Sequence, residues 1–168
     1  AFFERPHSVA LNAEGEIVVV DTWNYRIRRF TPEFNSISSW GQALTGGLAA
    51  ESMPTDGFWG PRDIAIDSLG QIYVSDTGNK RIRVYTPDGI YRYDIGSGGS
   101  GIGELDEPAG IAIHPDGRLF VADTWNRRVA VFALDGSHLY NFNVRGWYDQ
   151  LGNRPYLAVD TVRDLLYV

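Results

Sequence analysis

The 168-residue sequence contains no cysteine. This absence excludes disulfide bonds, thiol nucleophiles and zinc sites with cysteine ligands, and it leaves the cellular compartment open. No apolar run approaches the roughly 20 residues that a membrane-spanning helix needs. The first residues, AFFERPHSV, have neither the basic region nor the apolar core of a signal peptide. We therefore expect a soluble chain, cytoplasmic or extracytoplasmic, without a membrane segment.

Positive charge is scarce and is almost all of one kind. Lysine and arginine together number 15 against 21 acidic residues, the net charge is −6, and Lys80 is the single lysine. A negative overall charge disfavours binding to nucleic acid or to an anionic membrane. Arginine favours forked hydrogen bonds between packed elements. We predict no nucleic-acid partner.

Aromatic residues, glycine and proline are well represented. Aromatic residues make up 13% of the chain, and there are 19 glycines and 8 prolines. This mixture is typical of short strands joined by tight turns, so we predict an all-β fold.

An internal repeat organises the whole chain. A proline-led run with a central alanine, a turn and a second apolar run recur as PHSVALNAEGEIVVV, PRDIAIDSLGQIYVS, PAGIAIHPDGRLFVA and RPYLAVDTVRDLLYV. The spacing of about 47 residues is typical of four-stranded propeller blades. We predict one partial β-propeller domain over residues 1–168, with repeats at about 5–59, 60–106, 107–153 and a truncated 154–168.

The strands of each repeat can be placed from its turns. Inner strands are expected at 9–11, 64–66 and 111–113, with an alanine where neighbouring backbones crowd together. Second strands are expected at 17–20, 72–75 and 119–122, where nearly every residue is apolar, as for a strand covered on both faces. Outer strands are expected at 90–93 and 139–142.

A polar decapeptide follows the second strand of the first three repeats: DTWNYRIRRF, DTGNKRIRVY and DTWNRRVAVF. Asp, Thr and Asn accept backbone N–H bonds in tight turns, and Asn tolerates left-handed geometry, so D-T-x-N suits the hairpin into the third strand. One carboxylate per turn is too few ligands for an independent calcium site. We therefore assign a structural role to Asp21, Asn24, Arg26, Asp76, Asn79, Arg81, Asp123, Asn126 and Arg128.

The stretch PAGIAIHPDGRLFVADTWNRRV resembles the NHL repeat, whose pattern is P-x-G-I-A followed by an apolar residue and Y-V-A-D-T-x-N-x-R-I. The resemblance extends over essentially the whole chain. It implies a fragment of a six-bladed ring, completed by blades of a longer parent chain or by a second copy, and we expect one module of a larger bacterial protein.

Functional residues are expected where the repeats differ. The position after the proline of the inner strand holds His7, Arg62, Ala109 and, in the shifted fourth copy, Pro155. In a propeller this position lies at the axial mouth. His7 and Arg62 are therefore the predicted ligand-binding residues, and no catalytic residue is predicted.

Three functions of similar propellers remain as alternatives. Pro6 to Val9 resembles the P-H-x-hydrophobic motif of peptidyl-hydroxyglycine amidating lyases, which implies a zinc ligand at His7. A gluconolactonase-like hydrolase would hold calcium through carboxylates such as Asp63, Asp67 or Asp160. RNA-binding NHL domains use a positive face, but strand alternation puts neighbouring arginines on opposite faces.

Two loops complete the sequence-based predictions. We read GSGGSGIGELDE, residues 96–107, as a flexible connection between repeats. The insertion between Gly41 and Trp59 carries Met53, Phe58 and Trp59, which we expect to pack over the blade edge or to contact a partner. The leading prediction is a non-catalytic binding scaffold that needs no cofactor and holds a protein or small ligand at the propeller mouth.

Overall fold

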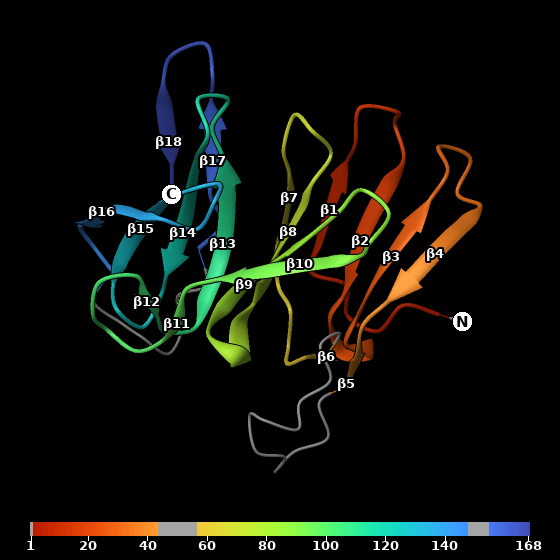
Figure 1. Cartoon of the computed structure of the whole chain (residues 1–168), viewed down its shortest axis with the longest axis horizontal. Helices are drawn as coiled ribbons and strands as arrows, with labels where there is room; N and C mark the ends of the chain where they lie inside the picture. Colours follow the sequence, from red (N-terminus) through yellow and green to blue (C-terminus); the bar gives the residue numbers. More distant parts are fainter. Residues whose placement is uncertain (1, 44–56, 148–154) are drawn as a thin grey trace.

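The computed structural model describes residues 2–43, 57–147 and 155–168, and these parts are built of β-strands with two short 3₁₀ helices and no α-helix (Figure 1). The all-β prediction is therefore confirmed. Met53 lies outside the described residues. In the described parts of the chain, no helix is long and apolar enough to cross a membrane.

Each of the first three repeats forms one four-stranded antiparallel sheet, with its strands in chain order. The first sheet contains β1 (Ser8–Leu11), β2 (Ile17–Asp21), β3 (Arg26–Phe30) and β4 (Ser36–Trp40). The second contains β7 (Ile64–Ile66), β8 (Ile72–Asp76), β9 (Arg81–Tyr85) and β10 (Tyr91–Ile95). The third contains β13 (Pro108–Ile113), β14 (Arg118–Asp123), β15 (Arg128–Ala133) and β16 (His138–Asn143).

The remaining elements are short. The fourth repeat contributes the antiparallel pair β17 (Ala158–Asp160) and β18 (Leu165–Tyr167). Two parallel pairs connect successive sheets: β5 (Gln42–Ala43) with β6 (Gly57–Phe58), and β11 (Ser97–Gly98) with β12 (Glu104–Leu105). The 3₁₀ helices η1 (Thr22–Asn24) and η3 (Thr77–Asn79) follow β2 and β8.

The inner strands of successive sheets lie next to one another. Strand β7 contacts both β1 and β13, and β13 contacts β17 (Figure 1). Small residues are required at this close approach. The amide of Gly110 donates to the carbonyl of Pro155 at 3.0 Å, and a Cβ atom at Gly110 would collide with that same carbonyl. Packing around the inner strands therefore explains the alanine and glycine of the repeat.

The hydrophobic core lies between sheets: the second and third sheets each pack against a neighbour on both faces, and the first sheet packs against the second. Val18, Val20 and Ile27 of the first sheet pack against Ile64 and Val74 of the second. A second cluster joins the second and third sheets, and a third joins the third sheet to the fourth repeat. The nearly continuous apolar second strands follow from this double burial.

Candidate functional site

A buried aspartate ends the second strand of each of the first three sheets. Asp21, Asp76 and Asp123 are each 0% exposed. In each case Oδ1 accepts a backbone N–H from the residue 17 positions earlier, which we call the lead-in residue because it precedes the inner strand. The lead-in residues are Glu4, Trp59 and Asp106, and the N to Oδ1 distances are 2.7, 2.8 and 2.6 Å. The aspartate thus binds the chain entering its own sheet as well as its own turn.

The arginine of the motif binds the other carboxylate oxygen. The distances from Nε to Oδ2 are 2.8 Å for Arg26, 2.9 Å for Arg81 and 2.7 Å for Arg128. The asparagine amide donates to the same carboxylate in all three turns. Burial raises the pKa of Asp76 and of Asp123, and the bonds from arginine, asparagine and the lead-in amide oppose that rise. These contacts place the recurring polar residues of the repeat inside the protein.

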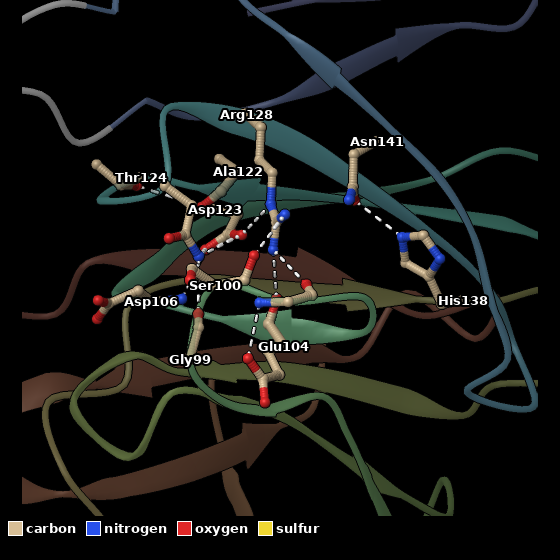
Figure 2. Close-up of polar contacts among 12 residues, drawn as sticks. Gly99, Ser100, Glu104, Asp106, Ala122, Asp123, Thr124, Arg128, His138 and Asn141 are labelled. Atoms are coloured by element: carbon tan, nitrogen blue, oxygen red, sulfur yellow. Dashed lines mark hydrogen bonds and ion pairs between the residues drawn. The ribbon is translucent and has the colours of Figure 1, made fainter.

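The third repeat shows what the arginine does beyond its own turn (Figure 2). The Arg128 guanidinium donates to the carbonyls of Ser100, Gly101 and Glu104 at 3.0, 3.0 and 2.8 Å. The Asn126 amide donates to the carbonyl of Gly99 at 2.9 Å. The glycine-rich connection is therefore held by side chains from the third sheet, and its interpretation as a flexible loop is wrong.

The residue with left-handed backbone geometry in each turn is not the motif asparagine, as the sequence suggested. It is the residue after the asparagine, namely Tyr25, Lys80 or Arg127, with φ of 53°, 58° and 56°. The amide of this residue donates to the carbonyl of the motif threonine. Because the asparagine side chain is bound to the aspartate, the asparagine lies in the 3₁₀ turn and the chain reverses one residue later.

The turns and the lead-in residues share one end of the sheets, where second strands end and inner strands begin. We call this end the turn face. His7 lies here: its amide donates to the carbonyl of Val20 at 3.2 Å, and its carbonyl accepts the Tyr156 hydroxyl at 3.3 Å. The first and fourth repeats thus meet beside His7 on the turn face.

The described residues do not fit the zinc site that the amidating-lyase resemblance implies. Ala109 occupies the position of His7 in the third repeat. His114 lies at the other end of β13, where its ring nitrogens contact Asp116 at 2.8 Å and Asp164 at 3.2 Å. Within residues 2–43, 57–147 and 155–168, no three His, Cys, Asp or Glu side chains are grouped for a metal ion.

The three carboxylates considered for calcium bind protein groups instead. Asp63 accepts the Ser8 hydroxyl at 2.6 Å and the Ile111 amide at 2.8 Å. Asp67 accepts two amides of its own turn, and Asp160 accepts two amides of the β17–β18 turn. Each therefore has a structural role in the described chain.

Arginines of the third strands are used in packing. Arg83 is 1% exposed and donates to the carbonyl of Gly57 at 2.9 Å. The Arg28 guanidinium lies 4.5 Å from the Phe30 ring centre, while Arg29, on the other face, pairs with Glu16 at 3.0 Å. These side chains do not form the continuous positive stripe on which single-stranded RNA binding depends.

Arg62 lines a cleft between the first and second sheets, with a volume of about 130 Å³. The other lining residues are Thr22, Trp23, Tyr25, Trp59, Gly60, Thr77, Gly78 and Glu107. Tyr25 stacks on Trp59 with ring centres 6.0 Å apart, and Trp23 meets Tyr25 edge-on at 6.5 Å. The cleft joins an aromatic wall to a cation and a carboxylate.

Most of this wall was not predicted from the sequence. Trp59 was expected only as part of the insertion, together with Phe58, and Phe58 is fully buried between the first two sheets. The sequence signal for this wall is the variation between repeats at equivalent positions. Trp59 takes the lead-in position held by Glu4 and Asp106, and Tyr25 takes a position held by Lys80 and Arg127.

Comparisons with known proteins agree with this architecture. The NHL repeat model matches residues 3–30, 58–85 and 105–132. Solved structures with a similar fold include a streptogramin B lyase, with a TM-score of 0.69, 14% identity, and coverage of 96% of this chain and 46% of the lyase. Virginiamycin B lyase from Staphylococcus aureus gives a TM-score of 0.67 and 14% identity, with coverage of 96% and 47%.

A nidogen/laminin complex gives a TM-score of 0.69 at 22% identity, with coverage of 96% of this chain and 55% of the matched one. The chain thus spans about half the length of these structures, and at such identities the likeness concerns the fold alone. No curated protein matches the sequence. Because the family model matches one segment in each of the first three repeats, and because those segments form consecutive four-stranded blades, the chain belongs to the NHL-repeat β-propeller family.

Proposed function

We propose that this chain is a non-catalytic binding module that holds its partner against the turn face. The observation that carries the proposal is a half-exposed tryptophan on this face in each of three successive blades. Trp23 and Trp125 occupy the same turn position and are each 44% exposed, and Trp59 is 46% exposed. Tryptophan is the residue most enriched at binding hot spots.

The buried motif supports the same assignment. The aspartates, asparagines and arginines of the turns bind one another and the lead-in chain, so they form a rigid frame beneath the exposed rings. A rigid aromatic surface loses little conformational entropy when a partner binds. The similarity of this fold to a chain in a nidogen/laminin complex supports the proposal of a protein partner.

The test is an array of peptides and glycans probed with the labelled chain. A double variant, Trp23→Ala with Trp125→Ala, is expected to weaken binding to its targets by at least about tenfold, because both rings are lost from the contact surface. Circular dichroism and urea unfolding confirm that the variant is folded.

The matched control is Leu69→Ala. Leu69 is 77% exposed and lies in the β7–β8 turn, at the opposite end of the second blade. This variant is expected to bind as the unaltered chain does. Equal loss of binding in both variants, or none in the tryptophan variant, would contradict a binding site on the turn face.

A further inference from the structure

The first junction between blades is built differently from the second. At the second junction, Lys80 pairs with Asp106 at 2.9 Å. At the first junction the equivalent positions hold Tyr25 and Trp59, whose rings stack with centres 6.0 Å apart. The Trp59 ring lies over Gly78, where a Cβ atom would collide with it. An aromatic contact thus takes the place of the ion pair, and the glycine makes room for it.

The threonine of the first turn also lacks the bond that its counterpart makes. The Thr77 hydroxyl donates to the carbonyl of Pro108, the first residue of the next inner strand, at 2.7 Å. Thr22 is 2% exposed, and its Oγ1 has no hydrogen-bond partner among the residues that the structure describes. Thr22 lines the cleft at the first junction. Because a buried hydroxyl is destabilising when it is unpaired, this atom indicates a ligand group that pairs with it.

The charged side chains of the cleft do not select its occupant. Arg62 and Glu107 line the cleft, and each already interacts with other groups of the protein. The surface left for a ligand is mainly the aromatic wall, formed by Trp23, Tyr25 and Trp59. An indole N–H only donates hydrogen bonds, and a threonine hydroxyl can donate one as well. The matching ligand therefore combines an apolar face with hydrogen-bond acceptors.

Proline is the amino acid that matches this surface. It has no backbone N–H, so a proline segment brings carbonyl acceptors to the cleft without donors that the wall would leave unpaired. The cleft volume of about 130 Å³ is below the roughly 150 Å³ of a cavity that encloses benzene, so it suits a five-membered ring better than a phenol or an indole. Proline-rich segments are also extended before they bind, and aromatic-lined grooves of other folds recognise them.

We infer that this cleft binds a proline-rich peptide segment in the polyproline II conformation. One pyrrolidine ring lies against Tyr25 and Trp59, and the Thr22 hydroxyl donates to a carbonyl of the segment. Both partners are ordered before they meet, so little conformational entropy is lost on binding. This inference rests on the proposed function, because it names the partner that the turn face holds.

The test titrates the chain with N-acetylated decaproline, followed by tryptophan fluorescence and saturation-transfer NMR. Decaproline is expected to bind with a Kd below about 1 mM. A glycine–serine decapeptide is expected to bind at least about tenfold more weakly, because it has no rings and carries a backbone N–H at every residue. Equal binding of the two peptides, or no binding of decaproline, would overturn the inference.

Two variants place the peptide in the cleft. Thr22→Val is expected to weaken decaproline binding about tenfold while leaving the urea midpoint unchanged or higher, because the hydroxyl that it removes is unpaired without ligand. Trp59→Ala is expected to weaken binding by at least about tenfold, because it removes half of the aromatic stack. Circular dichroism confirms that each variant is folded. Binding that survives both substitutions would contradict the assignment to this cleft.

Thr124→Val is the matched control. Thr124 is the equivalent threonine of the third blade, and its hydroxyl donates to the carbonyl of Ala122 at 3.2 Å. This variant is expected to unfold at a lower urea concentration and to bind decaproline unchanged. A loss of binding equal to that of Thr22→Val would show that the effect comes from a general loss of stability, and the role of the Thr22 hydroxyl would fail.

The same experiments separate the two proposals. If decaproline does not bind but the tryptophan double variant still loses its array targets, the turn face remains a binding site and the proline assignment fails. If decaproline binds through Thr22 and Trp59 while the double variant keeps its array targets, the cleft stands and the wider scaffold role of the face fails.

Discussion

At the scale of single residues, the motif aspartate determines how a blade closes. Asp76 is fully buried and accepts the Trp59 amide, the Asn79 amide group and the Arg81 guanidinium. Each bond joins the aspartate to a different part of the blade. The polar decapeptide therefore owes its composition to these buried contacts, and its recurrence reflects folding.

We expect Asp76→Ala to lower the free energy of unfolding by about 3 kcal/mol, because it leaves a half-buried arginine and a backbone amide without their acceptor. Urea unfolding measures the change. Asp88→Ala, at a side chain that is 79% exposed and 3.4 Å from Arg29, is the control and should change stability by less than about 1 kcal/mol. An unaltered unfolding midpoint in Asp76→Ala would refute the structural role.

At the scale of elements, equivalent strands have equivalent faces but different surroundings. Ile64 of β7 faces the first blade and is 5% exposed. Val9 holds the equivalent position in β1, on the face turned away from the second blade, and is 60% exposed. Leu11 of the same strand is 65% exposed. The apolar pattern of β1 is thus that of a strand between two blades, although in the described chain one of its faces is uncovered.

Because of this difference in burial, similar substitutions in β1 and β7 are expected to lower the free energy of unfolding by different amounts. Ile64→Ala should destabilise the chain by about 3 kcal/mol, because it leaves a cavity between two packed sheets. Val9→Ala should cost less than about 1 kcal/mol, since that side chain is largely in water already. Thermal and urea unfolding of the two variants measures both. Comparable losses would mean that another surface covers β1 in solution.

At the scale of the whole molecule, Asp63 connects three blades. It immediately precedes the inner strand of the second blade, accepts the Ser8 hydroxyl of the first blade, and accepts the Ile111 amide of the third. Asp63 as a whole residue is 6% exposed. Burial raises the pKa of Asp63 above its ordinary value of 3.8, and the bonds from Ser8, Ile111 and Ile64 oppose the rise.

The raised pKa predicts the direction of a pH effect. Between 3.8 and the folded-state pKa, the folded chain holds a proton that the unfolded chain has released. The stability contributed by this protonation is complete below 3.8 and is lost as the pH rises through the folded-state pKa. The destabilisation caused by Asp63→Asn should therefore be larger in acid and shrink as the pH rises.

Thermal unfolding over a pH series measures this difference between the unaltered chain and the variant. Subtracting the two curves removes the contributions of the other buried aspartates. Asp88→Asn makes the same change in net charge at an exposed side chain, so it is the control for overall charge. A cost of Asp63→Asn that grows with pH would show that the ionised carboxylate is the stabilising form.

Local regularity made the fold predictable from sequence. The alternation of inner and second strands and the positions of most turns follow from the spacing of alanine, glycine and apolar residues, and the strand predictions agree with the structure to within a few residues. Prediction from the repeat was accurate because each unit must satisfy the same packing against its neighbours.

Contacts between repeats were not predictable in the same way. The sequence predicted Arg62 at the mouth, but it did not predict that Thr22 and Tyr25 of the first blade lie beside Trp59, which leads into the second blade. Nor did it show that Arg128 binds the loop of residues 99–104, because glycine content alone suggests freedom of the backbone.

The sequence by itself determined the four-stranded unit, its family and the apolar surfaces that stack, because these depend on short-range periodicity. Only the tertiary structure decided that the recurring charges are buried and that one junction opens into an aromatic cleft with an unpaired hydroxyl. The reason is that hydrogen bonds and burial depend on which side chains of different blades meet, and that meeting is fixed by the packing of one blade against the next.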